Sequence, residues 1–155
     1  MLKWLMISTV VFFFDLISKN MVVSSLAPMQ HVNITSFFDL VLFYNQGAAF
    51  SFLADAGGWQ KYFFSFMAIF ASIVILVLIS KHSGQKLFCL ALSLVLGGAL
   101  GNLHDRVMLG HVVDFLLFYY KDYYWPAFNL ADSSICVGVA LLLYDNMNKK
   151  LPQEI

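Results

Sequence analysis

Two aspartates, Asp114 and Asp132, stand near the two ends of an apolar stretch of this chain. The first lies in the sequence GHVVDF and the second in FNLADSS, and most residues between them are aromatic or aliphatic. Two carboxylates in a partly dry site cannot both ionise comfortably, so such a pair tends to share one proton. One carboxylate can then deprotonate water while the other protonates a carbonyl, which is the chemistry of an aspartic peptidase.

Each carboxylate also has a simpler interpretation. Asp132 follows Asn129 at the start of an apolar run, and both residue types favour the first turn of a helix, where they cap it and interact with its dipole. Asp114 fits a hydrated loop at a membrane surface. The peptidase hypothesis is favoured by topology, because the apolar stretches place both acids at one membrane face, joined by a short loop.

The composition is that of an integral membrane protein. Of the 155 residues, 61% are hydrophobic and 12% are charged, and the mean hydropathy is +0.78. A soluble domain is about half apolar and about a quarter charged. The formal net charge is zero, which argues against a nucleic-acid partner because phosphate binding needs a basic surface. Cys89 and Cys136 lie in apolar runs and suit neither a disulfide framework nor a zinc site.

Four apolar stretches approach the length of about 20 residues that a helix needs to cross a bilayer. The spans are expected at about 4–23, 62–80, 87–103 and 130–147. The first stretch could be a cleavable signal peptide, but Asp15 and Lys19 interrupt it and Pro28 directly follows the only suitable cleavage point. The predicted fold class is an all-α membrane protein with four transmembrane helices and a small periplasmic β-rich platform, in one domain covering 1–155.

The lysines predict the orientation of the spans, because cytoplasmic loops carry an excess of Lys and Arg. Those expected on one side are Lys3, Lys81, Lys86, Lys149 and Lys150. Both termini are then cytoplasmic, and the segments at about 24–61 and 104–129 lie on the periplasmic side. Short β-branched and aromatic runs in HVNITSFFDLVLFYNQGAAFSFL predict that the platform comes from the first of these segments.

Ionisable residues inside membrane spans are costly and therefore suggest function, although each has a structural alternative. Asp15 and Lys19 are four residues apart and share one helix face as an ion pair, which is either structural or functional. Gly97 and Gly101 form a G-x-x-x-G pattern that lets another helix approach closely.

Two further features lie at the outer ends of the spans. Asp105 and Arg106 follow the third span, where they can anchor the backbone or each other. The segment 54–60 contains Gly57, Gly58 and Trp59. It fits a mobile flap, because glycines permit hinge motion, and equally a simple anchor at the membrane interface.

Five motifs together resemble the lipoprotein signal peptidase family, also called signal peptidase II. They match in order and spacing: DLISK (15–19), NQGAAFSF (45–52), GGALGNLHDR (97–106), GHVVDF (110–115) and FNLADSSICVG (128–138). The resemblance covers nearly the whole chain and includes the four-span plan. It implies a bacterial inner-membrane aspartic endopeptidase that removes signal peptides from prolipoproteins, cutting before a cysteine that carries diacylglycerol.

The resemblance also implies roles for particular residues. Asp114 and Asp132 match the two catalytic aspartates of the family. The residues that match the substrate groove, the support of the pair or a polar pair beneath it are Asn45, Asn102, Arg106, Asn129, Asp15 and Lys19. No cofactor or metal is implied, and family inhibitors such as the cyclic peptide globomycin are expected to block the site. The expected partners are diacylglyceryl-modified prolipoproteins and membrane lipid, with the chain acting as a monomer.

Other classes fit less well. A thiol oxidoreductase would need paired reactive cysteines in the outer loops, and a metalloprotease would need a histidine spacing that this chain lacks. The alternative is a small proton-coupled transporter that uses Asp114 and Asp132 as a relay, although the cytoplasmic halves of the spans hold no ionisable residue until Asp145. If the aspartates activate water directly, neither Ser51 nor Ser133 is needed as a nucleophile.

Overall fold

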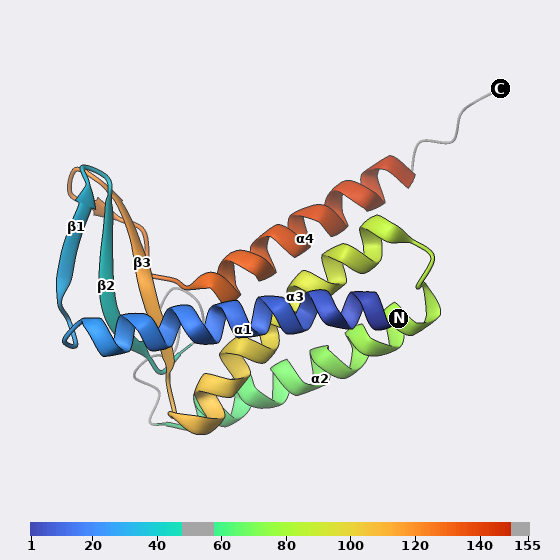
Figure 1. Cartoon of the computed structure of the whole chain (residues 1–155), viewed down its shortest axis with the longest axis horizontal. Coiled ribbons are helices and arrows are strands. Elements are labelled where there is room, and N and C mark those ends of the chain that lie inside the picture. The colour runs from blue at the N-terminus through green and yellow to red at the C-terminus, as the bar shows by residue number, and fades with distance from the viewer. Residues whose placement is uncertain (48–57, 150–155) are drawn as a thin grey trace.

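The computed structural model describes residues 1–47 and 58–149, and within them four helices are long and apolar enough to cross a membrane. They are α1 (Leu2–Ser25), α2 (Gln60–Lys81), α3 (Lys86–Met108) and α4 (Leu130–Lys149). The helices form a bundle, and a β-sheet lies across one end of it (Figure 1). This arrangement confirms the predicted fold class of four membrane helices with a small β-rich platform.

The third helix is longer than the span predicted from hydropathy. It continues to Met108, whereas the apolar stretch ended at about 103. Asp105 and Arg106 therefore belong to the last turn of α3 and not to the segment after it. Because residues three and four apart lie on one helix face, both residues share a face with Asn102.

α3 is the central helix of the bundle. Of the 18 most apolar consecutive residues of α3, 50% are buried, whereas the share is 11% to 17% in the other three helices. It packs against α1, α2 and α4. The other helices therefore turn most of their apolar side chains outward, as expected for surfaces that contact lipid.

Glycines allow α3 to lie close to its neighbours. A Cβ atom at Gly97 would lie 2.7 Å from the carbonyl oxygen of Ser8 in α1, and one at Gly101 would lie 2.5 Å from Oδ2 of Asp15. The G-x-x-x-G pattern was predicted to admit another helix, and that helix is α1. Gly98 permits the same close approach to the first turn of α4.

Within the described residues, four strands form one antiparallel sheet with neighbours in chain order. They are β1 (His31–Thr35), β2 (Phe38–Asn45), β3 (Val112–Tyr120) and β4 (Tyr123–Tyr124). The sheet thus joins both segments between the spans, whereas strands had been predicted only in the first. Phe43 of β2 pairs with Asp114 of β3, and Asn45 pairs with Val112.

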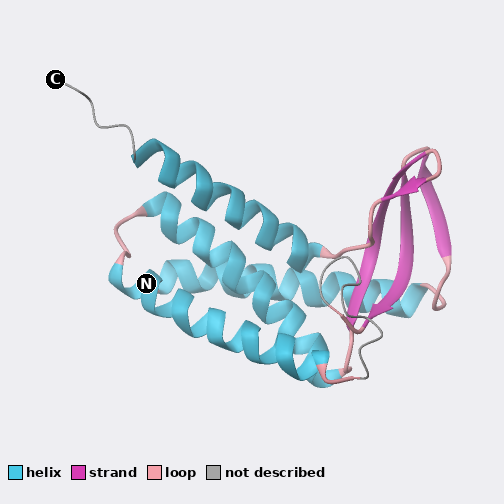
Figure 2. Ribbon diagram, turned by 180° about the vertical axis from the view of Figure 1, so that it is seen from behind, coloured by secondary structure: helices cyan, strands magenta, loops and turns pink. Residues whose placement is uncertain are grey.

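The sheet lies where α1 and α3 end and α4 begins (Figures 1 and 2). The chain that leads into α4 is tied to β3, because the backbone N–H of Leu116 donates to the Phe128 carbonyl at 2.8 Å and that of Phe128 donates back at 3.0 Å. This pairing holds the first turn of α4 beside the buried part of β3.

Candidate active site

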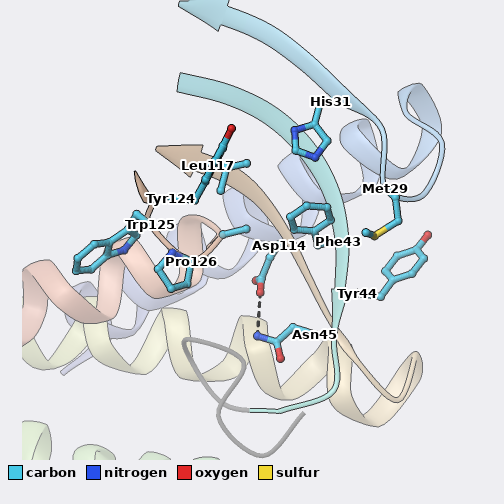
Figure 3. Close-up of a pocket in the computed structure, with 11 residues that line it drawn as sticks. Met29, His31, Phe43, Tyr44, Asn45, Asp114, Leu117, Tyr124, Trp125 and Pro126 are labelled. Carbon is cyan, nitrogen blue, oxygen red and sulfur yellow. Dashed lines mark hydrogen bonds between the residues drawn. The ribbon is translucent and has the colours of Figure 1, made fainter. Parts of the chain in front are cut away.

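Asp114 lies on β3 where the sheet meets the helices, and only 4% of the residue is exposed. Its carboxylate accepts hydrogen bonds from two amides, from Asn45 Nδ2 at 2.9 Å and from Asn129 Nδ2 at 2.8 Å. Figure 3 shows the Asn45 side chain pointing toward Asp114. Burial, and after it the charge of Asp132, raises the pKa of Asp114 to about 7. An acid with this pKa can hold a proton near neutral pH.

Asp132 lies in the first turn of α4 and is only partly buried. It forms a reciprocal cap with Asn129: the backbone N–H of Asp132 donates to Asn129 Oδ1 at 2.9 Å, and that of Asn129 donates to Asp132 Oδ2 at 3.3 Å. Asp132 is therefore a capping residue, as its simpler interpretation stated. Its other oxygen accepts a hydrogen bond from Asn102 Nδ2 at 2.7 Å, so capping does not use the whole carboxylate.

Asn129 connects the two carboxylates. It is completely buried (0% exposed), and its amide nitrogen contacts Asp114 while its amide oxygen and backbone N–H both bind Asp132. The same nitrogen lies 3.2 Å from Oδ1 of Asn102. A side chain with both donors and an acceptor is suited to this position, because its amide nitrogen donates to the Asp114 carboxylate while its amide oxygen accepts from the backbone N–H of Asp132.

A buried cation lies beneath the pair. Nζ of Lys19 is 2.7 Å from Asp15, 2.9 Å from Asp105 and 3.1 Å from Oδ1 of Asn102. The ion pair predicted from the spacing of Asp15 and Lys19 is confirmed, and it extends to a second carboxylate. Since Asn102 also binds Asp132, Lys19 is connected to the aspartate pair through one amide.

Asp105 is the member of this network that sequence reasoning did not assign to the site. Besides Lys19, it binds the backbone N–H of Val113 at 3.1 Å, next to Asp114. It anchors the backbone, as its position after the third span had predicted. Its link to Lys19 depends on how α1 packs against α3, which no local pattern encodes. Asp15 acts in a similar way on α4 by accepting a hydrogen bond from the backbone N–H of Ala131 at 2.8 Å.

Arg106 lies at the edge of the same network. Its guanidinium donates to the carbonyls of Asn102 at 3.2 Å and Gly47 at 3.3 Å, and its Cζ lies 5.5 Å from the ring centroid of Phe64. The residue joins α2, α3 and the chain after β2. The structure therefore brings together the eight residues predicted for the site: Asp15, Lys19, Asn45, Asn102, Arg106, Asp114, Asn129 and Asp132.

Two cavities reach the aspartates from different sides. One, of about 610 Å³, runs along the sheet and is lined by Asp114 and Asn45 (Figure 3). The other, of about 410 Å³, is lined by Asp132 and by Ile135 and Cys136 of α4. The segment 125–127 borders both cavities. Asp114 therefore lines one cavity and Asp132 lines the other.

The family model described as Signal peptidase (SPase) II matches residues 7–148 of the chain. The chain belongs to the signal peptidase II family. A protein named lipoprotein signal peptidase from Janthinobacterium sp. (strain Marseille) is 52% identical to this chain over 149 residues, covering 96% of this chain and 90% of the relative. A protein of the same name from Ralstonia nicotianae is 51% identical over 146 residues, covering 94% of this chain and 84% of the relative. The resemblance inferred from the five motifs is thereby confirmed.

Two solved structures, both described as bacterial membrane enzymes determined by the in meso method, share this fold. The one at 2.3 Å resolution has a TM-score of 0.85 and 29% identity, covering 99% of this chain and 94% of that chain. The one at 1.9 Å resolution has a TM-score of 0.80 and 30% identity, covering 92% and 91%.

The activity follows from family membership. The enzyme is a multi-pass membrane protease of the aspartic type, and it removes signal peptides from prolipoproteins. None of these comparisons favours the transporter alternative.

Some predictions fall on residues outside the described part of the chain. Ser51 and residues 54–57 of the suggested flap lie there, so the flap and anchor interpretations both stay predictions. Trp59, which is described, is exposed and precedes α2. Among residues 1–47 and 58–149, no three His, Cys, Asp or Glu side chains gather in a way that could hold a metal ion.

Proposed function

We propose that Asp114 and Asp132 are the catalytic pair, and that they hydrolyse the peptide bond before a diacylglyceryl-modified cysteine. The observation that carries this proposal is the position of Asn129, a buried residue whose side-chain amide donates to Asp114 and whose backbone N–H donates to Asp132, while each carboxylate lines a cavity. An acid that can hold a proton near neutral pH, beside a more exposed carboxylate, is the arrangement that general acid and base catalysis needs.

The reaction can be written with Asp114 as the acid and Asp132 as the base. Asp132 takes a proton from water while the water oxygen attacks the scissile carbonyl carbon, and Asp114 gives its proton to the carbonyl oxygen. When the C–N bond of the resulting diol breaks, Asp132 passes its proton to the leaving nitrogen. One hydroxyl proton returns to Asp114, which restores the starting state without a covalent enzyme intermediate.

The surrounding polar residues have supporting roles in this proposal. Asn45 and Asn129 orient Asp114, and Asn102 orients Asp132. Lys19 and Asp15 hold Asn102 and the start of α4 in place. Arg106 supplies positive charge beside Asn102, which binds Asp132, and this charge suits the negative charge that develops on a scissile carbonyl.

The cellular setting is also part of the proposal. The enzyme lies in the inner membrane of a bacterium as a monomer with both termini in the cytoplasm, and its aspartates face the periplasm. The lysine distribution supports this orientation. A site at the membrane edge suits a substrate whose acyl chains stay in lipid while its peptide bond meets water. Globomycin-like cyclic peptides are expected to block cleavage, and EDTA is not.

The catalytic assignment is tested with a diacylglyceryl-modified prolipoprotein and purified enzyme. Asp114→Asn and Asp132→Asn should each lower kcat by about a hundredfold to ten-thousandfold, the range for removing a general acid or base. The double variant should be scarcely worse, because groups that act as a unit are strongly non-additive. Asp122→Asn, at an exposed position between β3 and β4, is the matched control and should keep full activity. Appreciable turnover in either single variant would show that the pair is not the catalyst.

A further inference from the structure

The cavity at Asp114 continues along the sheet to β1. It passes Phe43, which pairs with Asp114 across the strands, and reaches His31 on β1 and Met29 just before it (Figure 3). The proposed cleavage chemistry uses only the end near Asn45 and Asp114. The far end therefore offers a surface of its own within the same cavity.

A polar network holds His31 in place at that far end. Its Nδ1 lies 3.4 Å from Oδ2 of Asp39 on β2, and its ring meets the Phe43 ring edge to face at 5.6 Å. Asn33 donates to the other oxygen of Asp39 at 2.9 Å and to the hydroxyl of Tyr119 at 2.8 Å. The hydrogen bond from Asn33 is the main cause that lowers the pKa of Asp39 below its ordinary value, so Asp39 is an anionic acceptor for the imidazole.

This network leaves one side of the imidazole available. A carboxylate at Nδ1 favours the tautomer that carries its proton there. In the part of the chain that the structure describes, Nε2 of His31 has no hydrogen-bond partner, and the side chain is 45% exposed. The nitrogen can therefore accept a hydrogen bond from a ligand in the cavity, or donate one when the ring is protonated.

The position of the sheet indicates which part of the substrate meets His31, and this step rests on the proposed function. A signal peptide must stay beside the membrane helices, whereas the sheet lies at one end of the bundle, beside the end of α1 (Figure 2). The cavity at Asp132 is bordered by Ile135 and Cys136 of a membrane helix, so it is the side nearer to hydrocarbon and acyl chains. The cavity along the sheet is left for the polypeptide after the cysteine.

We infer that the cavity along the sheet binds the residues that follow the modified cysteine, and that His31 is a specificity-determining residue for them. His31 makes a hydrogen bond to a polar group of this extended segment. Asp39 is a positioning residue that acts through the imidazole. Phe43 pairs with Asp114 and its ring contacts the His31 ring, so the contact is made by residues a short way past the cysteine and is lost in substrates that end at the cysteine.

The test compares two diacylglyceryl-modified substrates with the same signal peptide, one ending at the cysteine and one continuing with about six polar residues. His31→Phe keeps a ring against Phe43 but removes both nitrogens. It should raise KM for the long substrate about fivefold to tenfold, the value of one hydrogen bond, with kcat unchanged. The preference for the long over the short substrate should fall by the same factor. Asp39→Asn should shift KM in the same direction by less.

His82→Phe is the matched control, because His82 lies at the other end of the bundle, in the turn after α2. It should leave the preference between the two substrates unchanged. If His31→Phe raises KM or lowers kcat equally for both substrates, or changes neither, the inference is wrong. Failure of the proposed catalytic pair would look different, because it would appear as residual turnover in Asp114→Asn whatever the length of the substrate.

Discussion

At the scale of single residues, the two aspartates differ in their surroundings more than in their partners. Both accept hydrogen bonds from amides, yet Asp114 is buried on a strand while Asp132 is partly exposed at the start of a helix. Burial favours the neutral acid, and it raises the pKa of Asp114. The surroundings of Asp114 therefore suit the role of proton donor that is proposed for it.

This difference predicts a bell-shaped pH dependence of kcat/KM. Burial and the charge of Asp132 raise the pKa of Asp114 to about 7, so activity should fall as the pH rises through about 7 and the acid loses its proton. It should also fall in acid, where the base becomes protonated; both limbs are properties of the coupled pair. Asn45 donates to Asp114 and stabilises its anion. Asn45→Ala should therefore move the alkaline limb upward by up to about one pH unit.

The control for this shift is Asn33→Ala, which removes an amide bound to Asp39 instead of Asp114. It should leave the alkaline limb in place. An alkaline limb that does not move in Asn45→Ala would show that Asp114 is not the group that titrates there.

At the scale of elements, hydropathy was sufficient to find the four helices, and helix periodicity was sufficient to pair Asp15 with Lys19. Neither pattern revealed that Asp105 joins the ion pair of Asp15 and Lys19, because that contact arises only when α1 packs against α3. Nor did either pattern reveal strand β3, since VVDFLLFYY carries a polar residue inside an apolar run without regular alternation. The buried surroundings of each site residue come from tertiary packing, and no local pattern in the sequence reveals them.

The glycine contact between α1 and α3 gives a prediction at this scale. A methyl group at Gly101 would lie 2.5 Å from Oδ2 of Asp15, whereas one at Gly84 would meet nothing within 4 Å. Gly101→Ala should destabilise the protein by about 1–3 kcal/mol, the usual cost of overpacking, and it should lower activity because Asp15 holds the start of α4. Thermal unfolding in detergent and cleavage assays measure both effects. Gly84→Ala should be neutral, and equal behaviour of the two variants would contradict the packing argument.

At the scale of the whole molecule, the site lies where a sheet crosses the end of a membrane bundle. The two cavities approach the aspartates from the sheet and from the side of α4. The proposed substrate, with its signal peptide and acyl chains in the bilayer, could then present its peptide bond between the two cavities. This geometry needs the sheet to be on the side of the membrane that receives prolipoproteins, which makes the orientation of the chain a functional requirement.

The orientation predicts which turns are accessible from outside the cell membrane. Gly84 lies in the exposed turn between α2 and α3, and Asp122 lies in the exposed turn between β3 and β4. The two turns are at opposite ends of the molecule (Figure 1). Lys81 and Lys86 flank the first turn, so positive charge should hold it in the cytoplasm. Single cysteines at these two positions, in a Cys89→Ala and Cys136→Ala background, should react differently with a membrane-impermeant thiol reagent applied to spheroplasts. The reagent should label position 122 at once and position 84 only after the membrane is permeabilised. Labelling at 84 in intact spheroplasts would place the aspartates on the cytoplasmic side, where the proposed orientation cannot hold.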